Sequence, residues 1–405
     1  MNLRQQKGME IAKQKTIKTT KDGWLVKSQV SDNCYKVTDE FVCNCPDAEK
    51  RGVTCKHAYA VRYFLEVERD TPQGTQTEKV RLTYKQAWKA YTGAQCAEVK
   101  LFDKLLSDLV ESVEEPEQGM GRPRVPLKEQ VFCAIQKVYS QLSSRRAKSL
   151  FVNAEERQQI GKAPCYNMVN VVLNRKDITP ILYELLTISA SPLKDVDIDF
   201  AIDSSGFRTT CFNSYCQDKY SLEREHKWLK AHISTGTKTN IVAALEITNG
   251  EANDSPQFKP LVMTTNEAGF KVSEMSADKA YNSRDNYDAV QSVGGRGFIP
   301  FKSNSTGKAR GSLLWKKMFH YFQLNQEEFL QHYHKRSNVE STFAAIKKKF
   351  GETLKSKNRV AQENELICKF IAYNMTVVIH EMYELGIKAD FCSQSPEPAH
   401  NVGET

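Results

Sequence analysis

Apolar residues recur at two different periods along the chain, and the changes of period divide it into segments. Alternating stretches predict strands at 24–30 and 34–37, and a short helix is expected at Ala58–Glu66. The Pro- and Gly-containing run Thr71–Thr77 predicts a flexible linker. We therefore expect a small N-terminal module over residues 24–66 that is separated from the rest of the chain.

Apolar positions at three-and-four spacing then predict an amphipathic helix over residues 101–113. After a break at Glu114–Gly121, the pattern predicts short helices at Leu127–Tyr139, Ser144–Val152, Pro164–Leu173 and Thr179–Ser189. In the last of these, Thr179 is the expected N-cap and Pro180 lies in the first turn. A basic, multi-helical region over 80–190 is typical of DNA-binding units.

From about residue 195 the pattern becomes α/β. Strands are predicted at Val196–Ile202, Ala231–Ile233, Asn240–Ile247 and Phe298–Phe301, and helices at Glu328–Phe350 and Glu365–Leu385. We expect this domain to span residues 195–387. The polar, Pro-containing tail 388–405 is predicted to be disordered.

Charge is distributed unevenly along the chain. The whole sequence has 57 Lys and Arg against 49 Asp and Glu, but residues 122–176 hold eleven basic residues against three acids, and residues 335–359 hold eight against two. Such local excess suits a polyanion such as DNA, although solvated faces of uneven charge are an alternative. Within the first excess, Arg145, Arg146 and Lys148 are candidate DNA contacts.

The remaining totals bear on the cellular setting. The sequence has neither eighteen consecutive apolar residues nor the apolar run of a secretory signal, so no membrane span is expected. Eleven cysteines, an odd number spread over 405 residues, indicate free thiols in a reducing compartment such as the cytoplasm.

Four potential metal ligands lie within fifteen residues near the N-terminus. Cys43, Cys45, Cys55 and His57 give the pattern C-x-C-x9-C-x-H. Zinc prefers four tetrahedral sulfur or nitrogen ligands, and two close pairs joined by a loop can surround the ion. The alternative is four unconnected residues, and Cys34 is interpreted as a strand residue. The pattern resembles the SWIM-type zinc finger, which implies a structural zinc site in a module that binds DNA or protein.

Two acidic residues follow apolar segments of the α/β region. Asp203 comes at the expected end of the first strand, before Ser-Ser-Gly, and Asp278 follows a short apolar segment that starts at Phe270. Each could equally be a turn former or a helix cap. Phosphodiester transfer by two divalent ions needs converging carboxylates, so both are candidate ligands.

A third acid lies in the pattern Y-x2-R-x3-E-x6-K, made by Tyr333, Arg336, Glu340 and Lys347. On a continuous helix these four side chains would fall within about 60° of one another, beside an apolar stripe. Glu340 could then reach metal ions, while Arg336 and Lys347 neutralise phosphates. The alternative is a solvated face, since Arg336 and Glu340 form an ordinary i,i+4 pair.

At these residues the chain resembles the DDE transposases of bacterial and archaeal insertion sequences. The similar blocks, in order, are Asp199–Phe207, Ala231–Val242, Asn253–Phe258, Ala277–Tyr281, Ile299–Asn304 and Tyr333–Phe343, with Trp88–Tyr91 and Gly121–Arg124 upstream. The resemblance covers about residues 80–387.

The resemblance implies an RNase H-like catalytic fold, a mixed central sheet flanked by helices, with catalytic acids Asp203, Asp278 and Glu340 and with Mg²⁺ or Mn²⁺ as the ion. It implies terminal inverted repeats and target DNA as partners, a homodimer in the DNA complex, a role for Tyr333 at a flanking nucleotide, and a prokaryotic, nucleoid-associated location. Asp254 competes for the second acid, and His232 is interpreted as a core or supporting residue, not a base. A catalytically silent DNA-binding descendant and a general nuclease of the same fold are the alternatives.

Overall fold

The computed structural model describes residues 3–13, 17–20, 23–29, 33–38, 40–52, 54–64, 66–71, 74–79, 87–121, 123–209, 228–389 and 391. The chain divides into two compact units, Met1–Gln86 and Ala87–Thr405. Most of the tail predicted for 388–405 lies outside the described residues. Among the described helices, none has both the length and the apolar character needed to cross a bilayer.

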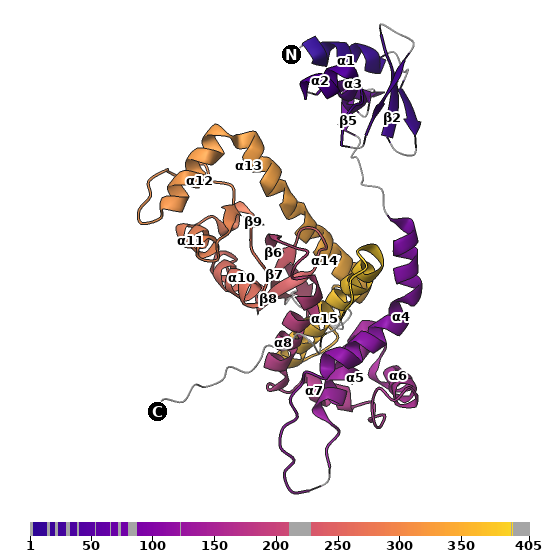
Figure 1. Ribbon diagram of the computed structural model, residues 1–405. Helices are drawn as coiled ribbons and strands as arrows, with labels where there is room; N and C mark the ends of the chain where they lie inside the picture. The colour runs from indigo at the N-terminus through magenta and orange to yellow at the C-terminus, as the bar shows by residue number, and fades with distance from the viewer. Residues whose placement is uncertain are drawn as a thin grey trace, which may run out of the picture. The chain divides into compact units, whose positions relative to one another are not determined.

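The first unit is a small three-stranded antiparallel sheet packed with helices (Figure 1). Its elements are α1 (Leu3–Lys13), β1 (Ile17–Thr20), β2 (Gly23–Lys27), β3 (Cys34–Val37), α2 (Pro46–Arg51), α3 (Lys56–Phe64), β4 (Glu66–Thr71) and β5 (Gly74–Lys79). The alternation of β2 places Trp24 and Val26 in a core with Val37 of β3 and Ala58 and Val61 of α3. The strands and the helix predicted here are confirmed to within a few residues.

The flexible linker predicted at Thr71–Thr77 is wrong. Thr71 and Gly74–Thr77 belong to the paired strands β4 and β5, which align in register from Glu66–Lys79 to Thr71–Gly74. Threonines at alternate positions 75 and 77 favour a strand.

The second unit begins with five helices: α4 (Trp88–Val110), α5 (Leu127–Ser140), α6 (Ser144–Glu156), α7 (Met168–Leu173) and α8 (Ile178–Ala190). The apolar stripe of α4, including Phe102 and Leu106, is fully buried, as its spacing predicted. The prediction of Thr179 as N-cap is wrong, because α8 begins at Ile178 and Asp177, two residues earlier, occupies the N-cap position. The hydroxyl of Thr179 instead donates a hydrogen bond to Asn364 (2.8 Å).

A five-stranded mixed sheet comes next in the chain, in the order β10-β9-β6-β7-β8. Its strands are β6 (Asp199–Arg208), β7 (Trp228–Gly236), β8 (Val242–Asn249), β9 (Glu274–Ala277) and β10 (Arg296–Phe298). Strands β6, β7 and β8 are antiparallel, whereas β6, β9 and β10 run parallel. The predicted fold class, an α/β domain with a mixed central sheet flanked by helices, is confirmed.

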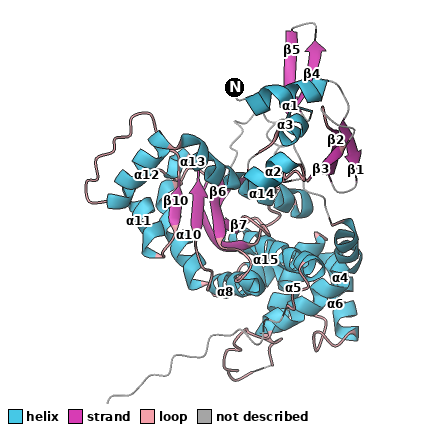
Figure 2. Ribbon diagram, turned by 45° about the horizontal axis from the view of Figure 1, so that its top comes forward, coloured by secondary structure: helices cyan, strands magenta, loops and turns pink. Residues whose placement is uncertain are grey.

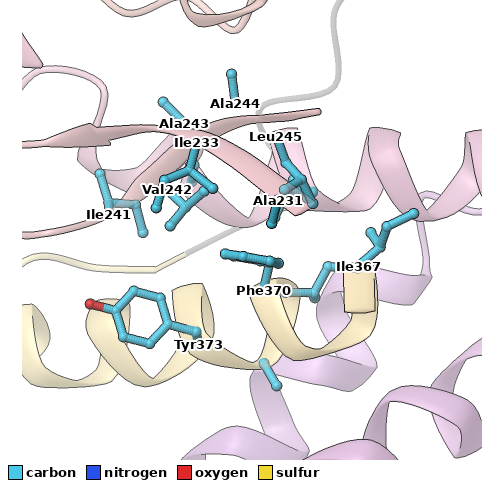
Figure 3. Packing of buried hydrophobic residues seen from close by; sticks show 14 of the residues in the cluster. Ala231, Ile233, Ile241, Val242, Ala243, Ala244, Leu245, Ile367, Phe370 and Tyr373 are labelled. Carbon is cyan, nitrogen blue, oxygen red and sulfur yellow. The ribbon is translucent and has the colours of Figure 1, made fainter. Parts of the chain in front are cut away.

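Helices cover both faces of this sheet (Figure 2). They are α10 (Ser255–Glu267), α11 (Arg284–Ser292), α12 (Leu313–Leu324), α13 (Gln326–Tyr333), α14 (Ser337–Phe350) and α15 (Arg359–Glu384), with 3₁₀ turns η1 (Ser191–Leu193), η2 (Lys279–Tyr281) and η3 (His334–Arg336). Helix α15 is buried along most of its length because it packs against the sheet and the preceding helices. Figure 3 shows Phe370 and Tyr373 of α15 facing Ala231 and Ile233 of β7.

One side chain of α15 joins three elements. Asn374 is fully buried; its side-chain oxygen accepts from the N–H of Val242 (3.0 Å), and its amide donates to the carbonyl of Val242 (2.8 Å) and to Ser189 of α8 (3.0 Å). Val242 opens the edge strand β8, so the amide supplies both hydrogen bonds that a further strand would otherwise supply there.

Candidate active site and metal cluster

The predicted zinc ligands converge in the first unit. One ligand atom from each of Cys43, Cys45, Cys55 and His57 lies within 4.8 Å of the others, and all four residues are buried. The Nδ1 atom of His57 is 3.9 Å from Sγ of Cys43 and 3.8 Å from Sγ of Cys55. Ligands around tetrahedral zinc are separated by roughly 3.6–3.8 Å, so these spacings fit the ion.

The local fold explains the convergence. The backbone of Cys43 forms an isolated antiparallel β-bridge with Val37 of β3. Cys45 precedes α2, whose first turn begins with Pro46. The thiols crowd one another: the hydrogen bond from Cys43 lowers the pKa of Cys55 to about 3, and the pKa of Cys43 is raised correspondingly. Such crowded sulfur ligands suit a cation. Cys34 is exposed on β3 and lies outside the cluster, as predicted.

In the second unit, strand register places two of the three candidate acids together. Ile202 of β6 pairs with Ala277 of the parallel strand β9. Asp203 and Asp278 are the next residues along the two strands, which lie about 4.8 Å apart. The prediction that Asp203 ends its strand is wrong, because β6 continues through Ser204-Ser205-Gly206 beside β7. Asp203 lies instead where the pairing with β9 stops.

Glu340 lies in the first turn of α14, and Arg336 connects it to Asp203. The guanidinium of Arg336 donates to Asp203 (2.5 Å) and to Glu340 (2.6 Å). The i,i+4 ion pair between Arg336 and Glu340 is therefore present, and Arg336 also pairs with Asp203 of the sheet. Burial raises the pKa of Asp203, and the nearby charges of Asp278 and Glu340 raise it further. Asp278 and Glu340 are thus near enough for their charges to act on Asp203, while Arg336 offsets part of that charge.

The helix predicted over Glu328–Phe350 is interrupted. Helix α13 ends at Tyr333, the 3₁₀ turn η3 follows, and α14 starts at Ser337. Short 3₁₀ turns are common at helix ends, and this one contains Lys335, which binds both Asp199 and Glu274 at 2.7 Å. The four residues of the Tyr-Arg-Glu-Lys pattern consequently do not form one regular stripe.

The other members of the pattern have distinct contacts. Lys347 donates to the hydroxyl of Ser205 on β6 (2.7 Å), and burial lowers its pKa. Tyr333 is half-buried against the hydrophobic core, with the Arg336 guanidinium 5.9 Å from its ring centre.

Asp254 lies near strand β6, but its negative charge is already neutralised by a lysine. Its carboxylate forms an ion pair with Lys230, accepts from Ser204 (3.1 Å), and lies 3.5 Å from Nδ1 of His232. His232 is fully buried, and its Nε2 atom contacts the hydroxyl of Thr248 (2.8 Å). Burial lowers the pKa of His232 to about 4, which fits its interpretation as a core residue.

Two features of this region were not found by sequence reasoning. Tyr281 is buried beside Ser204, and burial, together with the charges of Asp254 and Asp203, raises the pKa of its hydroxyl. Lys230 on β7 holds Asp254. The alternating pattern of β7 could have shown that Lys230 and His232 share a face of the sheet. Their common partner, Asp254, comes after β8 in the sequence, so the contact could not be predicted from the pattern.

Two family models match parts of the chain. A model of the transposase DDE domain matches residues 195–375, and a model of the SWIM zinc finger matches residues 42–63. The chain contains a DDE transposase domain and a SWIM zinc finger. No curated protein matches the chain. A piggyBac transposase, solved by cryo-EM as a synaptic complex with hairpin DNA, is 11% identical over 74% of this chain and 82% of that chain, with a TM-score of 0.30.

The remaining predicted DNA contacts lie outside the DDE domain match, on α6. Arg145 and Arg146 are exposed, and the guanidinium of Arg145 lies 5.5 Å from the ring centre of Tyr166. Lys148 is half-buried, and its ammonium donates to the carbonyl of Ala163 (2.9 Å).

Proposed function

We propose that the protein is a DNA transposase that cleaves the terminal inverted repeats of an insertion sequence and joins them to target DNA. The observation that supports this most directly is the adjacency of Asp203 and Asp278 at the β6–β9 pairing, with Glu340 joined to Asp203 through Arg336, inside a DDE transposase domain. We further propose that residues 24–66 form the zinc finger, 80–190 a DNA-binding region and 195–387 the catalytic domain.

The acids have the chemistry to hold divalent ions. Asp203, Asp278 and Glu340 offer hard oxygen ligands. Burial is the main cause of the raised pKa of Asp203, and the charges of Asp278 and Glu340 add to it, so a nearby cation would favour the charged form of this carboxyl. We propose Mg²⁺ or Mn²⁺ here and Zn²⁺ at the cysteine cluster. When bound, divalent ions lower the pKa of an attacking water and neutralise charge on the phosphate oxygens.

The side chains around the acids have separate roles in this proposal. Arg336 orients two carboxylates and can turn one N–H group toward a phosphate, because a guanidinium has five donors. Lys347 is held against β6 by its hydrogen bond to Ser205 and adds a positive charge on the side of α14 that faces this strand. Asp254 is not assigned as a ligand, because Lys230 already neutralises it.

The test is cleavage of a duplex that contains an element end. Asp203→Asn, Asp278→Asn and Glu340→Gln should each abolish metal-dependent strand cleavage while end binding, followed by mobility shift, remains near the wild-type level. Asp285→Asn, at an exposed acid in the first turn of α11, is the matched control and should cut normally.

Different outcomes would contradict different parts of the proposal. Normal cutting by one of the three variants would remove that residue from catalysis. A wild-type protein that binds ends without cutting them would be a silent DNA-binding protein, and equal cutting of unrelated DNA would indicate a general nuclease.

A further inference from the structure

The segment between β10 and α13 contains five exposed basic residues with no acid among them. The loop supplies Lys302, Lys308 and Arg310, and α12 supplies Lys316 and Lys317; residues 302–326 contain no Asp or Glu. Within the part of the chain that the structure describes, none of the five side chains forms an ion pair. We call these residues the basic strip.

The loop that carries three of the five residues of the strip is held in place by neighbouring side chains. Arg284 of α11 donates to the carbonyls of Ala309 (3.1 Å) and Lys308 (3.0 Å), and its guanidinium lies 4.5 Å from the ring centre of Trp315. The indole N–H of Trp315 donates to the carbonyl of Thr306 (2.8 Å). The basic groups are therefore presented on a backbone that needs little further ordering to bind a ligand.

Helix α12 completes the support for this loop. Gly307 packs so closely on Phe319 that a Cβ there would lie 2.9 Å from the ring. Ser312 caps α12 by accepting from the N–H of Trp315 (3.1 Å), and its hydroxyl donates to Asp288 of α11 (2.6 Å). Lys316 and Lys317 come in the first turns of the helix and point away from the buried Trp315 and Met318.

The strip begins near the segment that carries Asp278. Lys302 lines a surface hollow of about 610 Å³ together with Ala280, Asp254 and Lys230. Ala280 is two residues after Asp278. The carbonyl of Ile299, at the start of the loop, accepts hydrogen bonds from Tyr287 (2.6 Å) and Asn282 (3.4 Å), so the loop is anchored to the segment that carries Asp278.

The dimensions suit a nucleic acid backbone. A twelve-residue helix such as α12 is about 18 Å long, which corresponds to roughly five base pairs of duplex DNA. Five exposed cations with no acid between them suit the dense negative charge of a phosphate backbone. Every nucleotide of DNA carries a phosphate, whereas an acidic protein segment rarely carries a charge at every residue.

We propose that the basic strip binds the phosphate backbone of duplex DNA that extends from the scissile bond, along the loop 302–312 and α12. This inference rests on the proposed function, because it takes the carboxylates as the place of cleavage. It adds a surface on the catalytic domain itself that fixes one flank of the substrate.

The experiment compares two full-length variants with equal loss of charge. Lys308→Gln/Arg310→Gln/Lys316→Gln neutralises three members of the strip, and Lys259→Gln/Lys271→Gln/Lys388→Gln neutralises three exposed lysines elsewhere in the second unit. Both are made in an Asp203→Asn background, and affinity for end-containing duplexes is measured against salt concentration. A set of duplexes is shortened stepwise on either side of the cleavage site.

Each phosphate contact contributes about 0.9 to the slope of log K against log salt. The strip variant should lose about 2–3 from this slope and bind roughly 10- to 100-fold more weakly at 0.1 M salt, and only for duplexes that retain one particular flank. The single variant Lys316→Gln should lose about 1, and the control variant should match the parent.

Equal slopes for the strip variant and the control on every duplex would overturn this inference. The proposed function would fail differently, through absence of metal-dependent cutting by the otherwise wild-type chain.

Discussion

Arg336 lies between Asp203 and Glu340, where a bound metal ion would also be favoured. Replacing Arg336 therefore tests whether the arginine and a metal ion use the same carboxylates. In Arg336→Gln, Asp203 and Glu340 lose charged hydrogen bonds of 2.5 and 2.6 Å and face each other and Asp278 without a counter-charge. Breaking a fully buried pair costs about 3–5 kcal/mol. The side chains of Arg336 and Asp203 are 20% and 22% exposed and that of Glu340 is 59% exposed, so solvent screening reduces the expected loss to about 2 kcal/mol.

For a unit of this size, that loss corresponds to a Tm lower by roughly 3–6 °C in the presence of a chelator. Added Mg²⁺ should recover it, because an ion that binds only the folded state adds about 2.7 kcal/mol at a hundredfold excess over its Kd. The wild-type protein should gain less, since Arg336 and the ion compete for the same carboxylates.

The assay is thermal unfolding with and without Mg²⁺, followed by circular dichroism. Lys335→Gln is the control. Lys335 is the neighbouring cation in the sequence, but it pairs with Asp199 and Glu274 and not with the three candidate acids. This variant should lose stability without gaining any additional response to Mg²⁺. An equal Mg²⁺ response in the wild type and in Arg336→Gln would refute the idea that the arginine and the ion share one site.

Three further predictions concern other regions. Chelation of zinc, or Cys55→Ser, should unfold the first unit and leave the second intact, because structural zinc contributes about 10–16 kcal/mol to folding. Limited proteolysis would detect the unfolding, and Cys34→Ser is the control that should leave the unit folded. Asp197→Ala should cost about 2–3 kcal/mol in denaturant unfolding, because the buried carboxylate accepts from Lys238 N–H (2.8 Å) and the Thr239 hydroxyl (2.5 Å), whereas a loss below about 0.5 kcal/mol would contradict this role. The pKa of His232 falls from 6.5 to about 4 on folding, so the unfolded chain binds more protons between these values, and stability should rise with pH across that window; His232→Gln should flatten the rise, and an unchanged profile would exclude it as the cause.

The sequence was most informative where chemistry and local pattern coincided. The Cys/His spacing identified the cluster of the first unit, and acids beside apolar strands drew attention to Asp203 and Asp278. Their adjacency depends on the register of β6 against β9, which joins residues some 75 positions apart and leaves no local trace. The 3₁₀ turn at His334–Arg336 was missed because helical periodicity continues across it.

The basic strip could not be predicted from the sequence for a related reason. Its five cations are spread over sixteen residues of loop and helix, so no local run of charge stands out in the sequence. Only the folded loop, fixed by Arg284 and Trp315, brings them onto a common support. Likewise, the pairing of Lys230 with Asp254, which argues against Asp254 as the second acid, depends on tertiary contacts alone.

The amide of Asn374 has a consequence for how copies of this protein can associate. An outer β-strand with free N–H and C=O groups invites a strand from another molecule to extend the sheet. At Val242 both groups are already bonded to Asn374, so sheet extension between two molecules is blocked at the start of β8. Copies of the protein that meet at this part of the sheet would then have to associate through side chains, and Asn374→Leu should make the start of β8 available for pairing between molecules and so favour aggregation.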